Sequence, residues 1–219
     1  MRLGERLIAN DGYEVMLFPC EAMYLSEARD PDEHDVLALD FLPRNTQGQT
    51  ITGMKCYAPF SGTIVYTGND HNLILESDQV VHTPLGLKKM RVLVAHSWTA
   101  PTLGDHYSQG QEFYTTGNYG QSTAEHLHME IAEATGSYFN QGGIGLNGAV
   151  HMWEGLYVND TALLRPKNYN WVEWTSPAPH IRRKGSFLWV LYAKRLRNYK
   201  RWKYGNIISN CRYNSRKTR

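Results

Sequence analysis

Short runs of alternating or β-branched residues, separated by Gly, Asn, Asp and Ser, fill the first 164 positions of the chain. Runs of this length, bounded by turn residues, are typical of β-strands joined by short loops. They predict strands over residues 36–41, 55–57, 62–67, 72–76, 89–96, 112–115 and 126–132. We therefore expect a mainly β fold built on an antiparallel sheet.

The first of these runs contains a carboxylate at an unexpected place. Successive strand residues point to opposite faces, so Leu39 and Phe41 share one face and Asp40 lies on the other. Because Asp is depleted in strands, Asp40 becomes a candidate functional residue.

Two histidines in the run HLHMEIA, His126 and His128, are two residues apart. On a strand they project from the same face, roughly 6–7 Å apart along it. Neutral imidazole is the commonest metal ligand in proteins, so one histidine could bind a metal ion while the other acts beside it. An isolated pair of this kind can equally be a surface feature of a sheet, and the pair gains meaning only with further residues.

Such residues are present elsewhere in the chain. His34 lies in a polar loop six positions before Asp40, and His96 ends the strand predicted over 89–96. One His, one Asp and a second His form a three-ligand set that leaves the fourth position of a tetrahedral zinc ion open, as catalysis requires. Together these residues predict a catalytic metal site.

Four segments, in this order, resemble the lysostaphin-like, or LytM-type, zinc metallopeptidases that cut peptidoglycan cross-links. They are EHDVLALDF, APFSGTIVYTG, RVLVAHS and GQEFYTTGNYGQSTAEHLHMEI, and the resemblance covers about residues 24–133. It implies an antiparallel β metallopeptidase domain of the duplicated hybrid motif type. It also implies that His34, Asp40 and His128 bind Zn²⁺, and that His96 and His126 are catalytic residues that do not bind the metal.

The chain departs from the family pattern at two places. Five residues separate His34 from Asp40, where the family usually has three, and this longer spacing resembles the tail-associated members of small tailed bacteriophages. Ala124 and Glu125 precede His126, where the family more often has a small or apolar residue and Gly.

Several other polar residues match no motif position. Glu130 shares a strand face with His128 and could orient it, although we expect a solvated carboxylate. The remaining histidines, treated as ordinary polar residues, are His71, His82, His106, His151 and His180.

Charge divides the chain into two parts. Residues 165–219 contain 15 Lys/Arg and one acidic residue, whereas residues 1–164 contain 8 Lys/Arg and 20 Asp/Glu. We expect a β domain over 1–165, a linker over 166–185 and a basic aromatic extension over 186–219, with apolar residues at helical spacing between 187 and 204. The extension could contact an acidic protein surface, an anionic membrane or nucleic acid, or its apolar stripe could simply pack on the β domain. Docking on the acidic β domain or on a partner protein of a larger assembly is preferred. Nucleic acid fits least with the acidic β domain.

No stretch is apolar enough to cross a bilayer, and the N-terminal residues do not resemble a signal peptide. Of three cysteines, Cys20 and Cys56 could form one disulfide bond. The sequence thus predicts a zinc endopeptidase of bacterial peptidoglycan, located in a phage virion at the tail tip and associated with other tail proteins. The alternative is a non-catalytic tail protein with a degenerate metallopeptidase fold.

Overall fold

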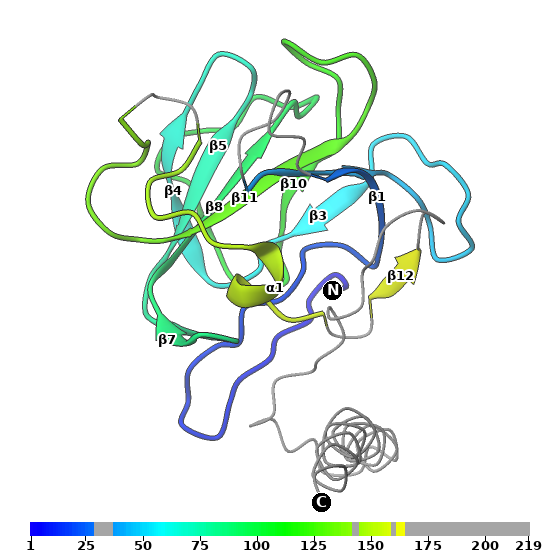
Figure 1. The fold of residues 1–219 in the computed structure, drawn as a ribbon. Helices are drawn as coiled ribbons and strands as arrows, with labels where there is room; N and C mark the ends of the chain where they lie inside the picture. The colour runs from blue at the N-terminus through cyan, green and yellow to red at the C-terminus, as the bar shows by residue number, and fades with distance from the viewer. Residues whose placement is uncertain (29–36, 142–144, 159–160, 165–219) are drawn as a thin grey trace, which may run out of the picture. The chain divides into compact units, whose positions relative to one another are not determined.

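An eight-stranded sheet dominates the computed structural model, which describes residues 1–28, 37–141, 145–158 and 161–164 (Figure 1). All of these residues belong to one compact unit, Met1–Ile181. The strand order in the sheet is β12-β1-β2-β11-β8-β5-β4-β9. Its strands are β1 (Ala22–Ala28), β2 (Leu39–Leu42), β4 (Gly62–Thr67), β5 (Leu73–Ser77), β8 (Met90–Ala95), β9 (His106–Tyr107), β11 (Leu127–Glu133) and β12 (Ala162–Leu164).

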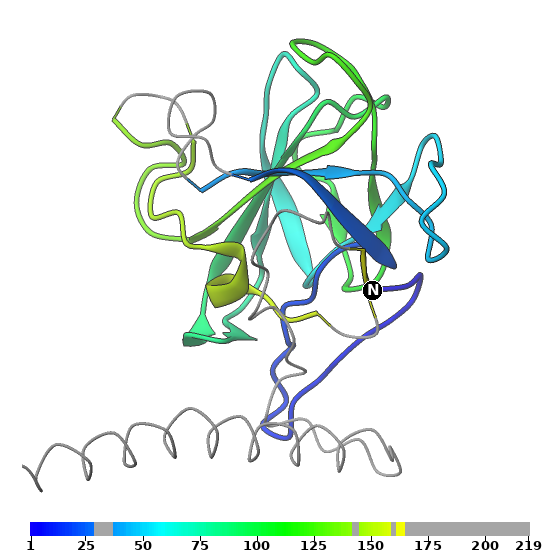
Figure 2. The same cartoon turned by 45° about the vertical axis from the view of Figure 1, so that its right-hand side comes forward.

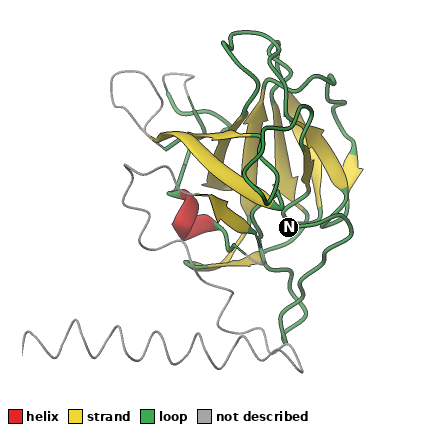
Figure 3. Cartoon of the chain, turned by 90° about the vertical axis from the view of Figure 1, so that its right-hand side faces the viewer, coloured by secondary structure: helices red, strands yellow, loops and turns green. Residues whose placement is uncertain are grey.

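Two small sheets and one short helix complete the described part. One small sheet pairs β3 (Lys55–Tyr57) with β10 (Glu112–Thr115), and the other pairs β6 (Val81–Thr83) with β7 (Gly86–Lys88). The helix α1 (Met152–Gly155) is the red element of Figure 3. Every ladder between these strands is antiparallel except β1 with β12. The expected mainly β, antiparallel fold is confirmed.

The two faces of the sheet are filled unequally. On β11, Leu127, Met129 and Ile131 are buried in the main hydrophobic core. The alternate residues His128 and Glu130 therefore lie on the opposite face. Polar residues of the candidate site thus occupy the face away from the main core.

Strand β8 is buried along its whole length, because both faces of the sheet are covered there. Val92 and Val94 pack into the main core, and Leu93 packs on the other side in a smaller cluster with Ile74 and Leu146. This explains why residues 92–95 of β8 form a continuous apolar run that does not alternate. His96 follows this fully buried strand directly.

Several predictions concern residues that the structure does not describe. His34, the expected linker over 166–185 and the basic extension over 186–219 lie outside the described ranges. Among the residues that are described, no helix has the length and apolar character needed to cross a membrane.

Candidate metal centre

Strand pairing brings the predicted site residues together. His128 on β11 lies directly opposite Asp40 on β2, and on its other side it lies opposite Ala95 on β8. His96 follows Ala95, and His126 precedes β11. Four of the five predicted residues therefore converge at one end of three neighbouring strands, and only His34 falls outside the described residues.

Distances between donor atoms fit a metal ion. The Oδ1 atom of Asp40 lies 3.1 Å from Nδ1 of His128, and its Oδ2 atom lies 3.5 Å from Nε2 of His126. Ligands about 2.0–2.1 Å from a tetrahedral zinc ion are about 3.3–3.4 Å from each other. Asp40 and His128 are thus spaced as two ligands of one cation. A looser set is formed by His96, His126 and His128, whose donor atoms lie within 4.8 Å of one another.

Two carboxylates flank the His128 ring. Asp40 is 7% exposed and Glu130 is 4% exposed, and an oxygen of Glu130 lies 3.7 Å from Nε2 of His128. Burial by itself disfavours the charged ring, but the two carboxylates raise the pKa of His128 to about 9 in the metal-free protein. A metal ion bound at Nδ1 of His128, the nitrogen nearest to Asp40, would replace the proton there.

The expectation that Glu130 is a solvated carboxylate is wrong. It is buried, and its Oε2 accepts a hydrogen bond from the backbone N–H of Leu146 at 2.8 Å. Leu146 belongs to a loop sixteen residues further along the chain, so alternation within β11 could not show that the carboxylate is covered. Glu130 therefore stands where it can orient His128.

Backbone carbonyls of the loop before β11 accept hydrogen bonds from the rings of the other two histidines, His96 and His126. Nδ1 of His96 lies 2.8 Å from the carbonyl oxygen of Tyr119, and Nδ1 of His126 lies 2.8 Å from that of Ala124. A carbonyl can only accept, so each Nδ1 carries hydrogen, and in the neutral ring each Nε2 keeps a lone pair. Burial and, to a smaller degree, the neighbouring histidines also lower the pKa of His96. His96 is thus a neutral imidazole at neutral pH, able to accept a proton at Nε2.

Glu125, one of the departures from the family pattern, has a structural role. Its carboxylate accepts hydrogen bonds from the Gly53 N–H at 2.5 Å and from the Thr116 hydroxyl at 2.6 Å. The side chain therefore ties the segment before His126 to a second loop.

We compared the chain with known proteins, and solved structures of peptidases are among those similar to it. No protein-family model matches the chain, and no curated protein matches its sequence. The catalytic domain of the antimicrobial peptidase lysostaphin from Staphylococcus simulans is 25% identical, with a TM-score of 0.33, over 46% of this chain and 68% of that one.

Two further solved structures are less similar in sequence. A mutant catalytic domain of the prophage-encoded M23 protein EnpA from Enterococcus faecalis is 14% identical, with a TM-score of 0.39, over 59% of this chain and 88% of that one. A zinc-containing peptidase from Vibrio cholerae is 16% identical, with a TM-score of 0.38, over 57% and 42%. These TM-scores lie below 0.5, so the functional proposal rests on the side chains of the site.

Residues outside the motifs differ in their surroundings. His82 contacts the carboxylate of Asp11 and His106 that of Asp78, as ordinary polar residues do. His71 instead packs against the loop that holds His96, because its ring stacks on Tyr119. The sequence carried no motif for this contact, which joins two loops far apart in the chain.

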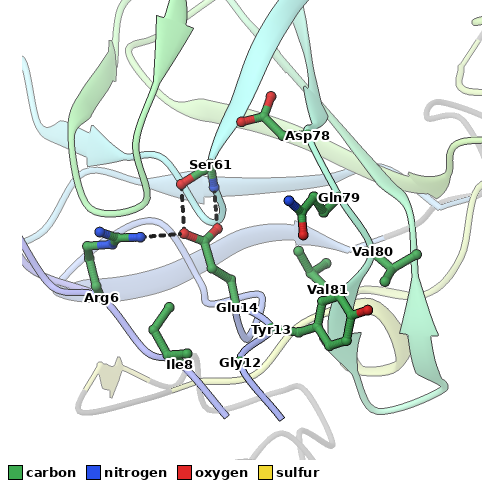
Figure 4. A pocket seen from close by; sticks show the side chains of 10 residues that line it. All are labelled: Arg6, Ile8, Gly12, Tyr13, Glu14, Ser61, Asp78, Gln79, Val80 and Val81. Atoms are coloured by element: carbon green, nitrogen blue, oxygen red, sulfur yellow. Dashed lines mark hydrogen bonds and ion pairs between the residues drawn. The ribbon is translucent and has the colours of Figure 1, made fainter.

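A separate pocket of about 260 Å³ contains none of the five predicted residues (Figure 4). Its central carboxylate, Glu14, accepts hydrogen bonds from the backbone N–H and the hydroxyl of Ser61, and from the Arg6 guanidinium. These contacts tie the N-terminal segment to the start of β4. Glu14 therefore has a structural role in this pocket.

Proposed function

We propose that the chain is a zinc-dependent endopeptidase that hydrolyses the peptide cross-links of bacterial peptidoglycan. The observation that carries this proposal is the 3.1 Å pair of Asp40 and His128 with His96 and His126 beside it. The ordered resemblance of four sequence segments to the lysostaphin-like peptidases supports the substrate class.

Asp40 and His128 would hold the zinc ion, with His34 as the third ligand expected from the sequence. Bound zinc supplies Lewis acidity, which acidifies a water molecule and polarises the scissile carbonyl. Glu130 orients His128 from the side opposite Asp40. Its negative charge makes the ring more basic, so that the ring donates its lone pair to the metal more strongly.

His96 and His126 perform the proton chemistry in this proposal. Each presents Nε2 with a lone pair when neutral, because a loop carbonyl holds the hydrogen on Nδ1. One of the two accepts the proton of the attacking water. The other, once protonated, donates to the developing oxyanion or to the leaving amine.

Mass spectrometry of fragments released from purified peptidoglycan, with and without a zinc chelator, tests the reaction. New amine and carboxyl ends that disappear with the chelator are expected. Asp40→Ala and His128→Ala should lose the metal. His126→Ala should retain one zinc per chain and lose hydrolysis. His106→Ala is the matched control and should keep both the zinc and the hydrolytic activity. Metal-loaded protein that cleaves no wall type would contradict the proposal.

We further propose that the enzyme acts from a phage virion, at the tail tip, where its basic extension binds other tail proteins. The support is the five-residue separation of His34 and Asp40 and the 15 Lys/Arg of residues 165–219. Deletion of residues 186–219 should leave hydrolysis intact and abolish incorporation into particles, measured by quantitative proteomics of purified virions. Equal incorporation of the truncated chain would contradict this role.

A further inference from the structure

Two non-glycine residues among those described have positive φ angles, and both lie at the candidate site. They are His71, with φ of 51°, and His96, with φ of 72°. L-residues rarely adopt this conformation, because it brings the Cβ atom too close to the following carbonyl oxygen, so surrounding contacts must maintain it. Backbone strain of this kind is concentrated at functional sites.

The loop residue Tyr119 contacts both strained histidines. Its ring stacks on the His71 ring with centroids 3.5 Å apart and planes 2° from parallel. Its backbone carbonyl accepts from Nδ1 of His96 at 2.8 Å, and its N–H donates to the carbonyl of His96 at 3.2 Å. The side chain and the main chain of Tyr119 therefore hold one histidine each.

His71 also reaches the other side of His96. Its Nδ1 lies 2.8 Å from the carbonyl oxygen of Ser97, and the preceding residue, Asp70, accepts a hydrogen bond from the N–H of His96 at 3.0 Å. The turn between β4 and β5 thus forms hydrogen bonds with the N–H of His96 and with the carbonyl of Ser97, on either side of the His96 side chain.

Close approach of the loops depends on glycine. A Cβ atom added to Gly120 would lie 2.2 Å from the Asp70 carboxylate, and one added to Gly117 would lie 2.3 Å from the carbonyl oxygen of His96. The turn between β4 and β5 and the loop before β11 therefore lie side by side, at the end of the sheet that Figures 1 and 2 show uppermost.

We propose that His71 is a positioning residue for the peptidase reaction and that its stack with Tyr119 clamps His96. The stack holds the Tyr119 carbonyl against Nδ1 of His96, which keeps the hydrogen on that nitrogen and the lone pair on Nε2, beside His128. This role rests on the proposed hydrolytic function. Among the described residues, His71 has its contacts with Tyr119 and Ser97 and none with Asp40 or His128, so it acts through His96.

Ring removal tests the clamp. Tyr119→Ala keeps the backbone carbonyl and loses the stack, and His71→Ala loses the stack and the contact with Ser97. Both should lower kcat about 10- to 100-fold, because misplacement of a catalytic group by about 1 Å costs up to 10²-fold. KM should stay within about twofold and zinc stoichiometry at one per chain, since Asp40 and His128 are untouched. Tyr119→Phe, which keeps the ring, should restore turnover.

A second readout does not depend on hydrolysis. In ¹⁵N imidazole spectra of the full chain, His96 should be purely the Nδ1–H tautomer in the wild type and Tyr119→Phe, and mixed in Tyr119→Ala and His71→Ala. His106→Ala, at an exposed histidine with a carboxylate partner, should match the wild type in both measurements.

The outcomes separate the two proposals. Unchanged kcat and an unchanged His96 tautomer in Tyr119→Ala would overturn the clamp while leaving the peptidase intact. A wild type without hydrolysis, but with the expected tautomer changes, would overturn the peptidase while supporting the clamp. Loss of zinc from both ring variants would show a general structural role and would also overturn the clamp.

Discussion

In the proposed metal centre, a proton and a metal ion would compete for His128. Its pKa of about 9 in the metal-free protein leaves roughly one ring in a hundred neutral at pH 7, so apparent zinc affinity should lie about 100-fold below its high-pH plateau. Between pH 7 and pH 8 the association constant should rise about tenfold. A histidine with the ordinary pKa of about 6.5 would give a rise of only about 1.3-fold.

Zinc titrations against a competing chelator of known pH dependence, at half-unit steps from pH 6.5 to pH 8, measure this rise. Glu130→Gln is the matched variant, because loss of one flanking charge lowers the pKa of His128 and flattens the slope. Glu133 lies on the same strand but is paired with Lys88, so Glu133→Gln is the control and should keep the wild-type slope. A rise of less than twofold for the wild type between pH 7 and pH 8 would refute the reasoning.

The same proton stabilises the metal-free fold. A histidine whose pKa is raised on folding contributes stability that is complete below about pH 6.5 and lost as pH rises through about 9. The difference between the ordinary histidine pKa of about 6.5 and the pKa of about 9 for His128 in the folded protein sets an upper bound of about 3 kcal/mol on this stabilisation. Thermal unfolding in chelator should therefore show Tm falling between pH 6.5 and pH 9, whereas zinc-loaded protein should not follow this fall. Parallel curves for the two forms would contradict the assignment.

Three further predictions concern the scaffold. Partial burial raises the pKa of Glu76, but ion pairs with Lys89 and Arg91 outweigh it and lower that pKa overall. Glu76→Gln should therefore lower the free energy of unfolding, measured in urea at pH 7, by about 1–3 kcal/mol. The loss should become smaller as the pH falls through the pKa of the folded carboxyl. The thiols of Cys20 and Cys56 are buried, with their sulfur atoms 3.0 Å apart. Refolding with glutathione disulfide should join them in a disulfide bond, which mass spectrometry detects as the loss of two hydrogens. The bond should raise the free energy of unfolding by up to about 4 kcal/mol. Gly117→Ala should lower Tm by several degrees in calorimetry, because its Cβ would meet backbone atoms.

Alternation along the chain was sufficient to predict the central strands. The strands expected over 55–57, 62–67 and 112–115 agree with β3, β4 and β10, and those over 72–76 and 126–132 are displaced by one residue. Side chains within one strand carry the signal for these elements. By contrast, β6, β7, β9 and β12 contain two or three residues each and exist through their pairing partners, which no local pattern reveals.

The candidate site shows the same division. Asp40, His126 and His128 were predictable because a strand places polar residues on a known face, and His96 because it ends an apolar strand. Backbone carbonyls that hold His96 and His126 could not be predicted, since every residue type has a carbonyl group. Contacts between distant segments, such as His71 with Tyr119, depend on how the loops fold together.

The pairing of β2, β11 and β8 has a consequence for how such a protein can change. Because His128 is opposite Asp40 and Ala95 by register, a slip of one residue would turn Leu127 and Met129 toward the site and bury both histidines in the core. Surface loops that do not contact His96 or His126 carry no such constraint and tolerate changes in length. Changes in the length of such loops can therefore reshape the surface around the candidate metal centre, while the strand register keeps Asp40 opposite His128.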